Sequence, residues 1–252
     1  FKQKTAYEIS LGLVGSEMCI RDRAYSLASG YNTTASNSAT VALGNSTSAS
    51  GHTAIAIGYG TTASGGYTTA MGYDTEASGT SSTAMGEETT ASGEYSTAMG
   101  FETEASDYAS TVIGQYNLLG STVTNSSEDF STENTAFVIG NGADEINRSD
   151  ALTVLFDGTT TIAGDLSINS DARLKANIIS LGSTLAKVLQ IDGKSYTMKK
   201  DENKKQKIGV LAQDIEKVFP ELVSESNGVK SVNYQGLVPV LINALIRTGT
   251  NP

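Results

Sequence analysis

The chain has 252 residues, a formal net charge of −10 and a composition that changes sharply along its length. The length suggests one or two domains, and the change of composition favours two or more. From Ala24 to Asn147 there are 13 acidic residues and no Lys or Arg, whereas Ser170 to Pro252 carries 12 basic and 8 acidic residues. Because an acidic surface repels phosphate backbones, this composition argues against nucleic acid as a partner.

The residue inventory also argues against several kinds of site. Cys19 is the only cysteine, so an intrachain disulfide and a zinc site of paired thiols are excluded. His52 is the only histidine, so one chain cannot assemble a Ser-His-Asp triad or a histidine metal cluster. No apolar stretch reaches the roughly 18 residues of a membrane span, and no phosphate-binding glycine loop opens a helix. We therefore expect no metal, no cofactor and no membrane insertion.

The first residues carry an unusual signature. The segment 7–23 reads YEISLGLVGSEMCIRDR and resembles translated sequencing-adapter read-through. We therefore interpret 1–23 as an artefactual or unstructured leader and leave it out of the fold. A short amphipathic helix is the alternative interpretation.

A strict repeat of 14 residues follows the leader. Seven glycines share this spacing without an insertion: Gly30, Gly44, Gly58, Gly72, Gly86, Gly100 and Gly114. Fourteen residues are too few for a helical hairpin but fit two short strands and two tight turns. We therefore predict a parallel β-roll over 24–117, in which each repeat forms one rung and consecutive rungs stack.

Two neighbouring columns of the repeat predict how the roll buries its side chains. One column consists of alanines and suits a thin interior: Ala28, Ala42, Ala56, Ala70, Ala84 and Ala98. The next column is large and apolar: Leu43, Ile57, Met71, Met85, Met99 and Ile113. Since adjacent strand residues point to opposite faces, the large column must face outward and pack against further copies of the chain. The reverse arrangement, with the large residues inside, is the alternative.

A threonine recurs once in every rung, in a third column: Thr33, Thr47, Thr61, Thr75, Thr89 and Thr103. The favoured interpretation is that these hydroxyls satisfy hydrogen bonds of the turns. An evenly spaced ladder for binding ice or a glycan is the alternative.

Runs such as Ser96-Thr-Ala-Met-Gly100 and Thr89-Thr-Ala-Ser-Gly93 resemble the head repeats of trimeric autotransporter adhesins. The resemblance covers about 24–117. It implies a left-handed parallel β-roll assembled as a homotrimer. The handedness and the number of subunits come from the resemblance and not from the spacing.

The regular period is lost after Asn117. We interpret the polar segment 118–134 as a linker and 135–169 as a small β neck. The neck is expected to contain strands at Phe137–Ile139, Leu152–Phe156 and Thr161–Ile162, separated by Asn-Gly and Asp-Gly turns.

Helical periodicity begins in the last segment, 170–252. One predicted helical face consists of Leu174, Ile178, Leu181, Leu185 and Val188. Further amphipathic helices are predicted from Ile208 to Phe219, ended by Pro220, and from Tyr234 to Arg247.

Four motifs of this segment resemble the endosialidase-type intramolecular chaperone of phage tailspikes and tail fibres. They are Ser170-Asp-Ala-Arg-Leu-Lys175, Ile208-Gly-Val-Leu-Ala-Gln213, Val218-Phe-Pro-Glu-Leu222 and Val232-Asn-Tyr234. The resemblance implies a domain that trimerises, templates the fibre before it and then cuts itself off in front of a serine.

Carried over to this sequence, the resemblance makes Ser170 the nucleophile, Lys175 its base and Asn169-Ser170 the scissile bond. Asp171 and Arg173 would order the turn and the contacts between subunits. A lysine can take the serine proton only where burial destabilises its ammonium form, and Leu174 and Ile178 are expected to supply apolar surroundings. From the residues alone, Ser170 as a helix cap and Lys175 as a solvated charge is the alternative.

Taken together, the sequence predicts a mostly β fibre protein with a C-terminal α+β domain: a β-roll shaft, a β neck and a self-cleaving serine peptidase domain. Its location would be a virion tail fibre or the cell exterior, with a surface glycan or another receptor as a possible partner. The alternative is a surface-recognition module whose trimerisation domain is retained. A glycan-degrading tailspike is disfavoured because Glu87, Glu88 and Glu102 resemble solubilising charges of a repetitive surface.

Overall fold

The computed structural model describes residues 20–21, 23–119, 127–199 and 204–246. The chain divides into two compact units between Ser167 and Ile168. Most of the predicted leader lies outside the described residues. Its Ile20–Arg21 forms a short strand, β1, that pairs in parallel with Thr34 and Ala35.

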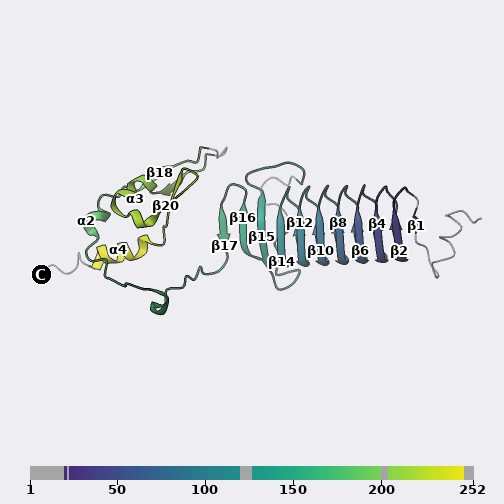
Figure 1. The fold of residues 1–252 in the computed structure, drawn as a ribbon, viewed down its shortest axis with the longest axis horizontal. Coiled ribbons are helices and arrows are strands. Elements are labelled where there is room, and N and C mark those ends of the chain that lie inside the picture. Colours follow the sequence, from purple (N-terminus) through teal and green to yellow (C-terminus); the bar gives the residue numbers. More distant parts are fainter. Residues whose placement is uncertain (1–19, 22, 120–126, 200–203, 247–252) are drawn as a thin grey trace, which may run out of the picture. The chain divides into compact units, whose positions relative to one another are not determined.

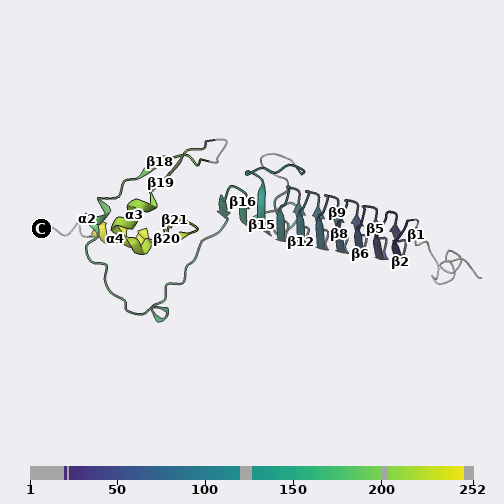
Figure 2. The same ribbon diagram turned by 45° about the horizontal axis from the view of Figure 1, so that its top comes forward.

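The first unit is a β-solenoid of about six turns, and the predicted β-roll is confirmed (Figure 1). One sheet is built from five-residue strands, one per rung: β2 (Leu27–Tyr31), β4 (Val41–Asn45), β6 (Ile55–Tyr59), β8 (Thr69–Tyr73), β10 (Thr83–Glu87), β12 (Thr97–Phe101) and β14 (Thr111–Gln115). The opposite sheet, seen along the other edge of the roll in Figure 2, consists of two-residue strands: β1, β3 (Thr34–Ala35), β5 (Ser48–Ala49), β7 (Thr62–Ala63), β9 (Glu76–Ala77), β11 (Thr90–Ala91) and β13 (Glu104–Ala105). The handedness of the roll stays a prediction.

The rungs stack in the register that the repeat predicts. Each strand pairs in parallel with residues 14 positions away, for example Ala84 with Ala98 and Gly86 with Gly100. Gly72 has a φ of +131°, and a Cβ at this position would overlap the carbonyl oxygen of Gly86 in the next rung. The glycine column is therefore required both by the backbone conformation and by the close approach of successive rungs.

The interior of the roll holds only small side chains over most of its length. The alanine column from Ala42 to Ala98 is fully buried, which confirms the predicted interior. The large column from Leu43 to Ile113 lies on the opposite face of the same strands and is partly exposed. The reverse arrangement, with Leu, Ile and Met inside, is therefore wrong.

The threonine column does not have either of its predicted roles. Its side chains are 0–1% exposed, so they cannot form a ladder that binds ice or a glycan. The hydroxyls of five consecutive members, from Thr47 to Thr103, also have no hydrogen-bond partner. Turn hydrogen bonds are made instead by a different column, in which Thr40, Thr68 and Ser110 donate to carbonyl oxygens three residues earlier.

The predicted neck strands form, and they extend the long-strand sheet of the roll. β15 (Thr135–Asn141) pairs in parallel with β14, with Val138 opposite Val112. β16 (Asp150–Leu155) and β17 (Thr160–Ile162) then continue the sheet in antiparallel fashion. The long-strand sheet of the roll therefore continues into the neck without interruption.

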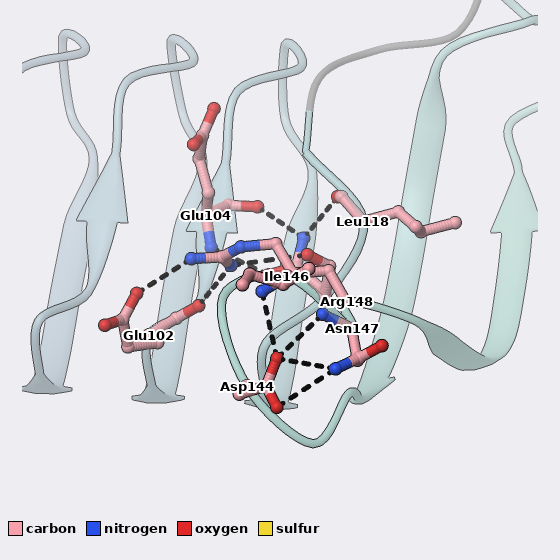
Figure 3. A network of polar contacts seen from close by, with 8 residues as sticks. Glu102, Glu104, Leu118, Asp144, Ile146, Asn147 and Arg148 are labelled. Atoms are coloured by element: carbon pink, nitrogen blue, oxygen red, sulfur yellow. Dashed lines mark hydrogen bonds and ion pairs between the residues drawn. The ribbon is translucent and has the colours of Figure 1, made fainter.

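A polar cap closes the short-strand sheet after β13, where stacking ends (Figure 3). The Asn117 side chain accepts a hydrogen bond from the Glu104 N–H (2.8 Å) and donates one to the Glu104 carbonyl (3.0 Å). Arg148 donates to the Glu102 carbonyl (2.8 Å) and to its carboxylate (2.7 Å). These contacts replace the hydrogen bonds of a further rung and protect the exposed edge.

The second unit combines short helices with two hairpins. The helical elements are α2 (Leu185–Val188), α3 (Ala212–Val218), α4 (Leu237–Ile246) and two 3-10 turns at Ala172–Leu174 and Pro220–Leu222. The hairpins pair β18 (Lys194–Tyr196) with β19 (Lys207–Gly209) and β20 (Val223–Ser226) with β21 (Val229–Val232). In the described ranges, no helix is long and apolar enough to span a membrane.

Two of the three predicted helices are confirmed in shortened form, as α3 and α4. The helix predicted over Leu174–Val188 is wrong for most of its length, because only its last residues form α2. Leu174, Ile178 and Leu181 are between 50% and 70% exposed, so the apolar period of this segment does not face the core of its own unit. The second predicted helix was expected to begin at Ile208, but this residue lies in strand β19.

The buried threonine hydroxyls lead to a stability prediction. Thr75→Val keeps the shape of the side chain and removes a buried oxygen that has no partner, so we expect a gain of about 1 kcal/mol in the free energy of unfolding. Denaturant unfolding of the full chain measures the change. Thr80→Val, at an exposed position, is the control and should change stability by less than about 0.5 kcal/mol. A loss of stability in Thr75→Val would contradict the prediction.

Candidate functional site

The predicted nucleophile and base lie next to each other. The Lys175 Nζ is 2.7 Å from the Ser170 Oγ and donates a hydrogen bond to it. The 3-10 turn Ala172–Leu174 folds the chain back over the five positions that separate the two residues, and the Lys175 N–H donates to the Ala172 carbonyl. An amine therefore lies beside a serine hydroxyl, close to the start of the second unit at Ile168.

The two predicted supporting residues hold this turn together. Asp171 caps the 3-10 turn by accepting a hydrogen bond from the Arg173 N–H (2.8 Å). Its carboxylate also binds the Arg173 guanidinium, with an Nη2 to Oδ2 distance of 2.6 Å. The Arg173 side chain and N–H lower the pKa of Asp171, and the Asp171 carboxylate raises the pKa of Arg173. Asp171 and Arg173 therefore order the backbone between Ser170 and Lys175.

The expected apolar surroundings of Lys175 are not formed by one chain. Leu174 is 70% exposed and Ile178 is 67% exposed, and Asn169, Ser170 and Lys175 are exposed as well. The expectation failed because it assumed a helix that would fold Leu174 and Ile178 against a core. The pair is thus assembled geometrically but lies open to water.

The remaining chaperone-like motifs contact one another in the second unit. The Tyr234 hydroxyl accepts a hydrogen bond from the Val210 N–H (3.1 Å). A Cβ on Gly209 would lie 2.6 Å from that hydroxyl, so a larger residue there requires the half-exposed Tyr234 side chain to move. The Asn233 N–H donates a hydrogen bond to the Leu222 carbonyl (2.8 Å). The Asn233 Oδ1 accepts one from the Gly236 N–H (3.1 Å) just before α4.

The motif around Pro220 positions a buried aromatic ring. Pro220 ends α3 and begins a 3-10 turn, which leaves Phe219 only 2% exposed. The ring packs with Ile215, Val218 and Val240, and the Lys187 ammonium lies 5.1 Å from its centroid. The Thr184 hydroxyl donates to the Val240 carbonyl (2.6 Å) and joins the start of α2 to α4.

A large apolar surface is exposed among the described residues of the second unit. On α4, only Val240 and Ala244 are buried, whereas Val238, Leu241, Ile242, Leu245 and Ile246 are between 46% and 71% exposed. Exposed apolar patches of this kind mark interaction surfaces. In the described ranges, no group of three or more His, Cys, Asp or Glu side chains could hold a metal ion.

Two family models match separate parts of the chain. Residues 170–224 match the Peptidase_S74 family, described as chaperone of endosialidase. Residues 24–47, 49–75, 77–103 and 91–117 match the YadA head domain repeat. Both resemblances stated from the motifs are therefore confirmed. The chaperone family matches the second unit, and the head repeat matches the roll.

A curated relative also shares part of the sequence. The chain is 29% identical over 91 residues to the long tail fibre protein Gp37 of Escherichia phage AR1. The match covers 32% of this chain and 8% of the phage protein. The chain therefore spans only a small fraction of that relative.

The packing of Tyr234 over Gly209 gives a second prediction. Gly209→Ala places a methyl group against the Tyr234 hydroxyl, so we expect a loss of about 2 kcal/mol in the stability of the second unit. Gly193→Ala is the matched control, since no atom lies within 4 Å of a Cβ at that position. Thermal unfolding followed by circular dichroism compares the two variants. Equal midpoints would contradict the role assigned to Gly209.

Proposed function

We propose that this chain is a subunit of a homotrimeric fibre, either a phage tail fibre or an extracellular adhesin-like filament, whose C-terminal unit acts as an intramolecular chaperone. The unit would drive assembly of three chains and then be released by cleavage between Asn169 and Ser170. The observation that carries the proposal is the 2.7 Å contact between Lys175 Nζ and Ser170 Oγ, at the start of the segment matched by the chaperone family.

The proposed cleavage uses groups of the chain and one water molecule. The Ser170 Oγ attacks the carbonyl carbon of Asn169 while Lys175 accepts the hydroxyl proton. The bond from this carbon to the Ser170 nitrogen then breaks, and the proton passes to the leaving amine. Water hydrolyses the resulting ester, which leaves a carboxylate on Asn169 and restores the Ser170 hydroxyl. Each chain completes this reaction once.

Assembly is proposed to complete the site. A lysine amine is an effective base only where water is excluded, and the single chain leaves Lys175, Leu174 and Ile178 exposed. Contact with a second subunit would bury these residues and so couple the cleavage to correct assembly. The domain would then leave the fibre only after its folding task is complete.

Two surfaces support assembly into an oligomer. The outer column of the roll presents a partly exposed row from Leu43 to Ile113, and α4 presents Leu241 and Leu245 to solvent. The described residues of its own unit leave each surface exposed, so both fit contacts between copies around a symmetry axis. The trimeric state is proposed from the family of the YadA head repeats.

The same proposal assigns roles to the segments. Residues 24–117 would form the shaft, 118–134 a linker, 135–169 the neck and 170–252 the chaperone, while Ile20–Arg21 would add a short strand to the start of the shaft. A virion or cell-surface location follows from the fibre role, and a surface glycan or another receptor would be the target.

Self-cleavage is tested with the full chain. We expect two fragments, one ending at Asn169 and one beginning at Ser170, identified by mass spectrometry and N-terminal sequencing. Ser170→Ala removes the nucleophile and Lys175→Ala removes the base, so each should reduce the cleavage rate by about a thousandfold or more. Asp171→Ala, which only loosens the turn, should slow cleavage less.

Two controls keep this test specific. Ser180→Ala changes a nearby exposed serine and should cleave as the unmodified chain does. Lys175→Arg keeps the positive charge but cannot serve as a base, so it should remain intact. An unmodified chain that stays whole after prolonged incubation as a trimer would reject the cleavage while leaving the chaperone role intact.

Assembly is tested on α4. We expect Leu241→Glu together with Leu245→Glu to convert the trimer to monomers or aggregates, because charges cannot be buried in an apolar contact. Analytical ultracentrifugation measures the mass. Ile146→Glu, at a position 93% exposed in the first unit, should leave the trimer intact. A folded monomer of the unmodified chain in dilute buffer would contradict the assembly proposal.

A further inference from the structure

A cavity of about 250 Å³ lies at the end of the roll, where the short-strand sheet stops and the long-strand sheet continues. β13 is the last short strand, whereas β14 is followed in its sheet by β15, β16 and β17 (Figure 1). The inner face of these later strands therefore has no opposite sheet, and space remains beside the corner that follows β13. The lining residues that carry the argument are Val112, Val138, Leu155, Thr153, Asp107 and Asp150.

Asp107 brings a buried carboxylate to this cavity. It is the one acidic residue buried among those that the structure describes, and only 3% of its surface is exposed. Its Oδ2 accepts a hydrogen bond from the Thr135 N–H (2.7 Å), at the start of β15. Its Oδ1 is buried and has no hydrogen-bond partner among the described residues. Because a buried charged oxygen without a donor is costly, this atom points to a donor from outside the roll.

The repeat carries this carboxylate only where the stacking of short strands ends. A Cβ on Gly93, the equivalent residue one rung earlier, would lie 2.2 Å from the Asp107 carbonyl oxygen, so the next rung leaves no room for a side chain there. Asp107 follows the last short strand, so its side chain has room. In the four preceding rungs the position is glycine: Gly51, Gly65, Gly79 and Gly93.

Asp150 adds a second carboxylate to the lining. Its Oδ1 accepts a hydrogen bond from the Leu118 N–H (3.0 Å), and its Oδ2 accepts one from the Thr153 hydroxyl (3.2 Å). Burial raises the pKa of Asp150, although these two hydrogen bonds lower it. Since a carboxylate oxygen has more than one lone pair, Asp150 can still accept a further donor.

The protein supplies no cation to balance these carboxylates. No Lys, Arg or His is found among the described residues that line the cavity. A neighbouring roll of a fibre has none to insert either, because Lys and Arg are absent from Ala24 to Asn147 and Arg148 is paired with Glu102 (2.7 Å). A metal ion is disfavoured, since the described ranges contain no group of three or more His, Cys, Asp or Glu side chains that could hold one. The cation that fits is therefore a small organic one.

We propose that this cavity binds a small primary alkylammonium ion. The ammonium group donates a hydrogen bond to the Asp107 Oδ1, and the Asp150 carboxylate contributes a second negative charge. The alkyl chain lies against Val112, Val138 and Leu155. Water can reach such a site, but it neither neutralises the carboxylates nor covers the apolar wall. The proposal concerns the first unit and is independent of the proposed cleavage and assembly.

The test titrates n-pentylamine into the full chain by isothermal titration calorimetry, in phosphate buffer, which contains no competing amine. We expect n-pentanol, which has the same alkyl chain without the charge, to bind at least about tenfold more weakly. Methylamine keeps the charge without the chain and should also bind more weakly, because it leaves the apolar wall uncovered. Asp107→Asn keeps an acceptor for the Thr135 N–H but removes the charge, so it should weaken binding of n-pentylamine about tenfold.

The matched control is Asp165→Asn, which removes an exposed carboxylate elsewhere in the first unit and should bind n-pentylamine as the unmodified chain does. Circular dichroism checks that Asp107→Asn folds. The unmodified chain gives a second readout without any substitution, because n-pentylamine should raise its thermal unfolding midpoint and n-pentanol should not. Equal affinities for the amine and the alcohol would overturn the proposal, as would equal weakening in Asp107→Asn and Asp165→Asn. Running the titrations also on Ser170→Ala separates the result from self-cleavage.

Discussion

The close stacking of successive 14-residue rungs is the constraint on which the rest of the first unit depends. Because equivalent residues of neighbouring rungs lie one strand spacing apart, each column meets its own side chain above and below. A Cβ at Gly72 would overlap the next carbonyl, and over most of the roll the two sheets leave room between them only for Ala, Ser and Thr, with Val112 and Val138 at the end of the core. The repeat is therefore strict because one wrong residue would affect two neighbours at once.

This constraint also explains what the roll cannot do alone. An interior of alanine and threonine buries little apolar surface per residue, so the large side chains from Leu43 to Ile113 must lie outside. There they remain partly exposed, which is why we propose that further copies of the chain cover them. At the end of the short-strand sheet, the last strand lacks a neighbouring rung. Asn117 and Arg148 replace the hydrogen bonds that this rung would make. A thin solenoid thus depends on a cap at its end, and the proposed assembly would cover its outer apolar column.

The parts of the fold that could be predicted from the sequence are those in which all residues of one repeat column have the same surroundings. The register, the alanine interior and the outward apolar column could be predicted because each recurs in at least six of the seven rungs. The threonine column was misread because a hydroxyl suits several environments, and here five buried oxygens have no partner. Arg148 was missed because it reaches Glu102 across 46 residues, although Asn117, standing where earlier rungs have threonine, was a visible signal. The helix expected from Leu174 failed because its apolar period does not face its own unit.

The absence of the helix expected from Leu174 also affects the candidate site, because Ser170 and Lys175 remain exposed. Ser170 and Lys175 could be paired from their motif, and a short capped turn holds them at 2.7 Å without help from the rest of the unit. Local geometry is thus available in a single chain, whereas exclusion of water is not, because every residue from Asp157 to Leu181 is exposed. A reaction that needs both conditions cannot run efficiently before other surfaces cover this segment. Under the proposed function, the exposed leucines and isoleucines beside Lys175 would serve assembly first and cleavage second, because their burial would have to precede the reaction.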